Sequence, residues 1–147
     1  MRVFQLGKYV PWVFKGGIET NTSYIANALS DKVDMNVVVS NVTRVWEHSK
    51  INYVNYFLLP KLFSFLEAPF TIPFFTLLSI SLPDIIHLHV PNPWFEVFLL
   101  AYFLVKGKKT KLIITYHADA PNYTIIHRAA DFFRSLYLIP LLNLSDK

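Results

Sequence analysis

The chain has 147 residues, a length that favours one domain with a core of its own. Apolar residues make up 53% of it, aromatic residues 16% and charged residues 16%, which excludes a disordered or fibrous chain. It has no cysteine, so disulfides, thiol catalysis and cysteine-rich zinc sites are excluded, and its net charge of +4 is mild.

The first part of the chain alternates between apolar runs and glycine-rich or polar breaks. Arg2–Leu6 predicts a buried strand, and Gly7–Gly17, which contains proline and glycine, predicts a loop. Ile18–Leu29 places its apolar residues near one helical face. Met35–Ser40 and Ile51–Leu59 then predict a valine-rich strand and an aromatic-rich strand.

Leu62–Leu82 is the best candidate for a membrane span. It carries one charge, Glu67, and two prolines, Pro69 and Pro73, which break a helix interior. We therefore expect Leu62–Ser81 to be helical in pieces, buried or interfacial rather than spanning a bilayer.

The second half of the chain continues the alternation of strands and helices. Asp84–Val90 and Lys111–Tyr116 predict strands. Trp94–Val105 predicts an apolar helix that Gly107 ends, and Ile125–Leu144 predicts a further helix.

Lys106, Lys108, Lys109 and Lys111 form a dense basic cluster between two of these elements. The cluster is shorter than typical nucleic-acid-binding tracts, so no nucleic-acid partner is expected. A solvated loop or a contact with acidic lipid headgroups would explain it.

Three of the expected strands are almost wholly apolar: Val3–Leu6, Val37–Val39 and Ile85–Leu88. Strands of this kind are covered on both faces, as in a parallel sheet between helices. The predicted fold is therefore α/β, a doubly wound and mainly parallel sheet. Such sheets carry their chemistry at the carboxyl ends of the strands.

Glycines and polar residues follow three of the expected strands and should converge on this rim. They are Gly16, Gly17 and Glu19, then His89 and Asn92, then His117 and Asp119. The backbone N–H groups of a glycine pair before a helix can hold an anion, although a flexible turn also uses such a pair. Glu19 suits the positive end of the helix dipole, so a capping role is an alternative to a site role.

His87 and His89 lie two residues apart in a strand and so share a face. With His117 or Asp119 as a third ligand they could bind zinc and support hydrolysis. The alternative is that they are buried, hydrogen-bonded histidines of a sheet covered on both sides.

Taken in order, four stretches of the chain resemble the N-terminal half of a GT-B glycosyltransferase of the glycosyltransferase family 4 group. They are Met1–Pro11, Lys15–Thr20, Pro83–Pro93 and Thr115–Asp119. No single stretch is specific, but their order and spacing are. The resemblance implies one Rossmann-like, acceptor-side domain over residues 1–147.

By this resemblance, Gly16 and Gly17 face the diphosphate of the donor, and His117, the catalytic candidate, approaches the transferred sugar. The acceptor side is assigned to Glu19, Asn92 and Asp119. The family transfers a sugar from a nucleotide-sugar donor, usually with retention and without a required metal ion or cofactor. Many members act at membranes on lipid-linked acceptors, and a glycan acceptor is the other possibility.

Family members also have a second Rossmann-like domain, which binds the nucleotide with an Arg/Lys pair and a Glu-x7-Glu motif. The sequence ends before the first domain is normally complete, so we expect it to be inactive without a donor-binding domain supplied in cis or in trans. The alternatives are a non-catalytic, membrane-associated module and a metal hydrolase that uses His87, His89 and His117.

The apolar surplus predicts peripheral association with the cytoplasmic, inner face of a membrane through Tyr56–Ser81. This segment is rich in phenylalanine, and Lys61 lies beside it to reach headgroups. The competing explanation is that these aromatic side chains pack under another part of the protein.

Overall fold

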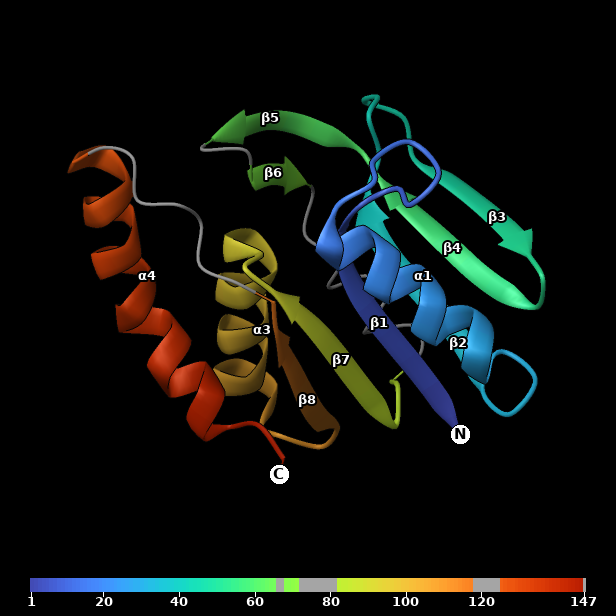
Figure 1. The fold of residues 1–147 in the computed structure, drawn as a ribbon. Helices are drawn as coiled ribbons and strands as arrows, with labels where there is room; N and C mark the ends of the chain where they lie inside the picture. Colours follow the sequence, from blue (N-terminus) through green and yellow to red (C-terminus); the bar gives the residue numbers. More distant parts are fainter. Residues whose placement is uncertain (66–67, 72–81, 118–124, 147) are drawn as a thin grey trace.

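The computed structural model describes residues 1–65, 68–71, 82–117 and 125–146. A central sheet has the strand order β3-β4-β2-β1-β7-β8 (Figure 1). Its strands are β1 (Arg2–Tyr9), β2 (Asp34–Ser40), β3 (Glu47–Ile51), β4 (Val54–Leu59), β7 (Ile85–Val90) and β8 (Lys111–Tyr116). All neighbours pair in parallel except β3, which runs antiparallel to β4 at one edge. The described helices are α1 (Gly17–Leu29), α3 (Pro93–Lys106) and α4 (Ile125–Asn143).

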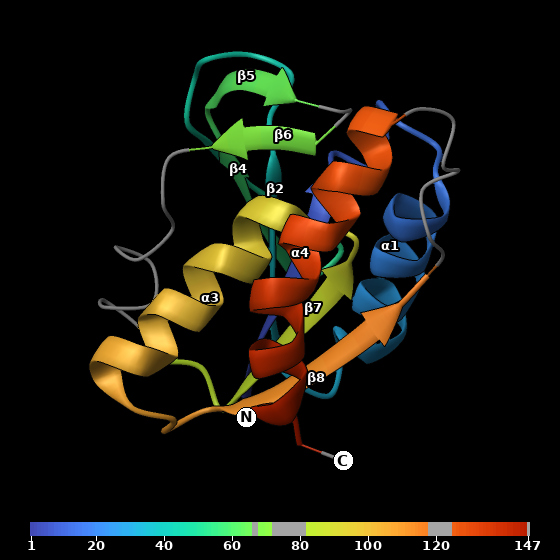
Figure 2. The same ribbon diagram turned by 90° about the vertical axis from the view of Figure 1, so that its left-hand side faces the viewer.

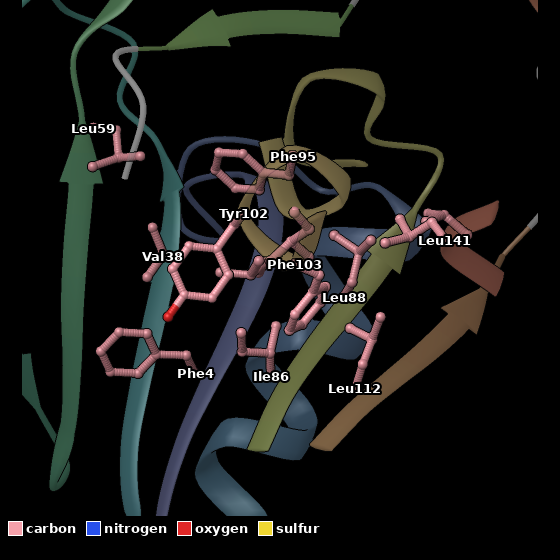
Figure 3. Close-up of a cluster of buried hydrophobic side chains, with 13 residues drawn as sticks. Phe4, Val38, Leu59, Ile86, Leu88, Phe95, Tyr102, Phe103, Leu112 and Leu141 are labelled. Carbon is pink, nitrogen blue, oxygen red and sulfur yellow. The ribbon is translucent and has the colours of Figure 1, made fainter. Parts of the chain in front are cut away.

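Alternate side chains of the central strands enter cores on opposite faces of the sheet, because successive residues of a strand point to opposite sides. Phe4 of β1 packs with Phe95 of α3 in the cluster that Figure 3 draws. Its neighbour Val3 packs with Ala26 of α1 instead. The helices α1 and α3 therefore cover opposite faces, as Figure 2 also shows. The predicted doubly wound, mainly parallel α/β fold is confirmed.

The strand β1 is longer than predicted, because Gly7 lies inside it rather than at the start of a loop. A Cβ atom added at Gly7 would lie 3.0 Å from Cγ1 of Val39 and 3.1 Å from Oγ1 of Thr22. Glycine at this position therefore lets α1 pack closely on β1 and β2.

Gly7→Ala should lower the free energy of unfolding by about 1–3 kcal/mol, the usual cost of overpacking a tight core. Urea unfolding of the purified chain measures this change in the free energy of unfolding. Gly17→Ala is the matched control, since a Cβ atom at Gly17 meets nothing within 4 Å. Equal midpoints for Gly7→Ala and the wild type would show that the α1 contact is not tight.

One prediction along the chain is wrong, and one strand was not predicted. The expected strand Ile51–Leu59 is β4 from Val54 onward, and the unpredicted β3 precedes it in a hairpin that turns at Asn52 and Tyr53, both with positive φ. The polar composition of β3 hid it from the sequence. The expected helical pieces after Leu62 begin instead as a second hairpin, β5 (Lys61–Phe65) with β6 (Ala68–Thr71). Residues 66–67 and 72–81 of that prediction lie outside the described residues.

The β5–β6 hairpin lies over the first turn of α3. Phe70 stacks on Phe63 with ring centroids 4.8 Å apart and meets Trp94 edge-on at 4.3 Å. Phe63 and Phe65 remain exposed. Within the described ranges, no helix has the length and apolar character needed to cross a membrane.

The helix α4 packs alongside α3 (Figure 2). Leu141 of α4 enters the core beside Leu112 of β8. Arg134 donates from Nε and Nη2 to the two carboxylate oxygens of Glu96 at 2.9 and 3.1 Å. The outward side of α4 exposes a row of apolar side chains, namely Ile125, Ile126, Phe132, Phe133, Leu136 and Ile139.

Candidate functional site

The carboxyl ends of β1, β7 and β8 meet at one edge of the sheet, because these strands are parallel neighbours. We call this edge the carboxyl rim. Gly16 and Gly17 follow β1, Asn92 follows β7, and His117 follows β8. The backbone N–H of His117 donates to the carbonyl of Val90 at 3.1 Å, which holds the end of β8 against the end of β7. Asp119 lies outside the described residues.

The N-terminus of α1 presents backbone N–H groups at the carboxyl rim. Gly16 is the N-cap residue and its backbone is extended (φ −108°). Because glycine has no side chain, Gly16 cannot cap the helix with one. The first intrahelical bond runs from Thr20 N–H to the Gly16 carbonyl at 3.0 Å. The N–H groups before Thr20 therefore lack an intrahelical acceptor, as at any helix start, and can bind an anion.

The two glycines differ in what lies in front of them. The buried carboxylate of Glu19 folds back so that its Oε2 occupies the place where a Gly16 side chain would be. The space at Gly17 is open, because a Cβ atom there would meet nothing within 4 Å. Glu19 thus fills the approach to Gly16 and leaves the approach to Gly17 free.

Three histidines lie close together on the α1 face of β7 and β8. The rings of His87 and His89 are 4.4 Å apart, and those of His89 and His117 are 5.2 Å apart. Nδ1 of His89 hydrogen-bonds Nε2 of His117 at 2.9 Å, and Nε2 of His89 hydrogen-bonds Nε2 of Gln5 at 2.8 Å. Nε2 of His87 hydrogen-bonds Oγ1 of Thr115 at 2.7 Å.

Burial keeps these imidazoles neutral. It is the main cause that lowers the pKa of His87 to about 4 and that of His89 to about 3, and the charges of neighbouring histidines add to it. Burial also lowers the pKa of His117, while the negative charge of Glu19 opposes part of that shift. At neutral pH, His117 is therefore an uncharged ring at the rim, half-exposed and able to donate and accept hydrogen bonds.

The arrangement suits hydrogen-bonded histidines rather than a metal centre. Both ring nitrogens of His89 already have partners, so neither lone pair is free for zinc. Within the part of the chain that the structure describes, no group of three or more His, Asp or Glu residues could hold a metal ion. The zinc hydrolase alternative, which needed His87, His89 and His117 together, gains no support from this geometry.

Asn92 lies at the rim but is buried and already bonded. Its Nδ2 donates to the carbonyl of Gly7 at 2.9 Å, and its backbone N–H donates to Oε1 of Glu96 at 2.7 Å. The first bond ties the start of α3 to β1, and the second closes the first turn of α3. A role for Asn92 toward an acceptor stays a prediction, as do the predicted roles of Glu19 and Asp119.

Sequence inspection missed two residues that shape this region. Gln5 is the polar member of an apolar strand, a signal that could have marked it as a buried partner. Arg134 left no such signal, because its partner Glu96 is 38 residues away and the pairing depends on how α4 docks.

The model of the family described as Glycosyltransferase Family 4 matches residues 15–147 of the chain. The chain belongs to glycosyltransferase family 4. The resemblance inferred from the order of the four motifs is thereby confirmed. Comparisons with curated proteins and with solved structures gave no significant match. The family 4 match includes Gly16, Gly17 and His117, whereas all of β1, including Gln5, lies before it.

Proposed function

We propose that this family 4 domain is the acceptor-side half of a retaining glycosyltransferase that takes a sugar from a nucleotide-sugar donor. The observation that carries the proposal is the meeting of two features at the carboxyl rim. One is the open helix start at Gly17, and the other is the neutral, half-exposed ring of His117. The charge of Glu19 acts on His117 and its carboxylate lies over Gly16, so both features share one neighbourhood.

The chemistry needs stabilisation of charge on the leaving group. Breaking the bond between the anomeric carbon and the diphosphate oxygen leaves the electron pair and negative charge on the diphosphate. Preorganised N–H groups at the start of α1 oppose that charge. His117 contacts the sugar, and together with the α1 N–H groups it binds the donor weakly without any other domain. A donor-binding domain, in cis or in trans, supplies the cations that hold the nucleotide tightly. The transfer requires no metal ion or cofactor, and the acceptor is a lipid-linked sugar or a glycan.

Gly17→Ala tests the donor assignment without harming the fold. A methyl group fits the open space, and replacing a helix-start glycine stabilises the chain by up to about 1 kcal/mol. The same methyl group blocks the approach of a diphosphate to the N–H groups. We expect wild-type amide resonances of residues 16–18 to shift with one of the uridine-, guanosine- or adenosine-diphosphate hexoses. Gly17→Ala should weaken that binding at least tenfold.

The control for this titration is Gly107, which lies at the other end of α3 and has open space around it. Its resonance should not move. Equal binding by the wild type and Gly17→Ala would contradict the donor assignment, and so would the absence of shifts at residues 16–18 with every nucleotide sugar.

We further propose that the carboxyl rim rests on the cytoplasmic, inner face of a membrane, where a lipid-linked acceptor would be found. Large exposed apolar side chains gather in the segments at this end of the sheet, the β1–α1 and β2–β3 loops and β5 (Figure 1). They are Trp12, Val13, Phe14, Val45, Trp46, Leu62, Phe63 and Phe65. Lys15 and Arg44 are exposed among them and suit anionic headgroups. We therefore propose a contact that reaches beyond Tyr56–Ser81.

Flotation with anionic vesicles tests the membrane contact. Val13 and Phe65 are 51% and 57% exposed, and changing both to serine removes apolar surface from the rim. Each such side chain contributes roughly 1.5–3 kcal/mol when fully buried, so the partition coefficient should fall tenfold or more. The matched control changes Leu104 and Val105 to serine.

Leu104 and Val105 are 75% and 79% exposed at the far end of α3, next to the lysine cluster. The wild type and this control should float equally well. Loss of flotation in the control alone would place the membrane contact at the lysine-rich edge. Failure of all three folded proteins to float would favour the alternative that another part of the protein covers the aromatic side chains.

A further inference from the structure

Gln5, His89 and His117 form a hydrogen-bonded row that runs from the interior to the carboxyl rim. They come from three adjacent strands, β1, β7 and the end of β8. Gln5 and His89 are fully buried, whereas His117 is half-exposed. Among the described residues, the row therefore links two buried polar side chains of the sheet to His117 through side-chain hydrogen bonds.

The donors and acceptors in this row have one consistent direction. An amide nitrogen only donates, so Nε2 of Gln5 donates and Nε2 of His89 accepts. A neutral imidazole carries its proton on the nitrogen that does not accept, so the proton of His89 is on Nδ1. That proton is donated to Nε2 of His117, which places the proton of His117 on its own Nδ1.

We propose that Gln5 and His89 are positioning residues that hold His117 in the Nδ1–H tautomer, with an N–H donor available to an oxygen of the substrate. The inference rests on the proposed function, since the oxygen belongs to the sugar or the diphosphate of the donor. Within the described residues, Nδ1 of His117 has no hydrogen-bond partner in the free protein.

The surroundings of the row favour hydrogen-bond donation from Gln5 to His89 and from His89 to His117. His89 remains neutral far below physiological pH because burial lowers its pKa to about 3, so it cannot donate from both nitrogens. His87 is held beside it by Thr115 and is neutral as well, with a pKa lowered to about 4. The carboxylate of Glu19 acts on His117 and favours protons on that ring.

The tautomers can be observed directly in the free 147-residue chain by two-bond ¹H–¹⁵N correlation of the imidazole rings at neutral pH. We expect the proton on Nδ1 in both His89 and His117. A proton on Nε2 of His117 would overturn the proposal, because the row would then run in the opposite direction.

A matched pair of variants tests whether His89 sets the tautomer. His89→Asn keeps an N–H near the position of Nδ1, so His117 should remain in the Nδ1–H form. His89→Leu removes the donor, and the Nε2–H form of His117 should become populated. Gln5→Met gives the same readout without emptying space at His89, since it removes the donor and keeps most of the side-chain volume. An unchanged His117 tautomer in His89→Leu and Gln5→Met would contradict a positioning role.

The nucleotide-sugar titration separates this inference from the proposed function. A shift of the His117 Nδ1 proton resonance together with Gly17 supports both. An Nδ1–H tautomer with no response to any nucleotide sugar would contradict the proposed function and leave the row intact. A response at Gly17 with His117 in the Nε2–H form would contradict the row alone.

Discussion

Replacing Arg134 by alanine should lower the free energy of unfolding by about 3–5 kcal/mol. The reason is the charge that remains: Glu96 is fully buried, and Arg134 supplies two hydrogen bonds to its carboxylate. A buried carboxylate without its cation is strongly destabilised. Urea unfolding of the purified chain measures the difference.

Two variants control for this interpretation. Arg2→Ala removes the surface ion pair with Asp34, in which both side chains are more than 40% exposed, and should cost less than about 1 kcal/mol. Glu96→Gln combined with Arg134→Met removes both charges and should recover much of the loss. A cost for Arg134→Ala as small as that for Arg2→Ala would mean that α4 is not docked through this pair.

Acid should begin to destabilise the chain at a pH above the range in which carboxylates titrate. His87 and His89 are neutral in the folded protein, with pKa values of about 4 and about 3, but regain a pKa near 6.5 on unfolding. The unfolded state therefore binds more protons between pH 6.5 and about 4, so stability falls as the pH falls through this window. By pH 4, each histidine should have lowered the free energy of unfolding by up to about 3 kcal/mol.

Chemical denaturation at a series of pH values between 7 and 4 tests this. His48→Gln is the control, because it removes an exposed histidine of β3 in place of a buried one. His89→Leu should make the free energy of unfolding depend less on pH. A stability that does not change between pH 6.5 and 4 would contradict the burial of neutral histidines.

The fold was predictable where strands are buried on both faces. β1, β2 and β7 contain nearly continuous apolar runs and are mostly buried, and such runs indicate a parallel sheet. β3 has the polar sequence Glu-His-Ser-Lys-Ile, which does not indicate a strand, and it is held in the sheet by antiparallel pairing with β4. The β5–β6 hairpin was missed for a different reason: an apolar run with prolines has no periodicity that separates helix from strand.

The positions of the site residues were also predictable, but their partners were not. The rule that parallel strands end at one edge placed Gly17 and His117 together. Nothing local connects Gln5 with His89, which is 84 residues away, because β1 and β7 are brought together by the sheet. For Asn92, the family resemblance suggested the acceptor side, whereas its bond to the Gly7 carbonyl became visible only in three dimensions.

A crystal of the chain, soaked with the nucleotide sugar that shifts its resonances, would reveal the donor site directly. We predict the diphosphate at the N–H groups of Gly17 and Ile18, with the sugar beside His117 and one of its oxygens within hydrogen-bonding distance of Nδ1 of His117. A nucleotide sugar bound instead at the opposite edge of the sheet, at the lysine cluster around Gly107, would contradict this site assignment.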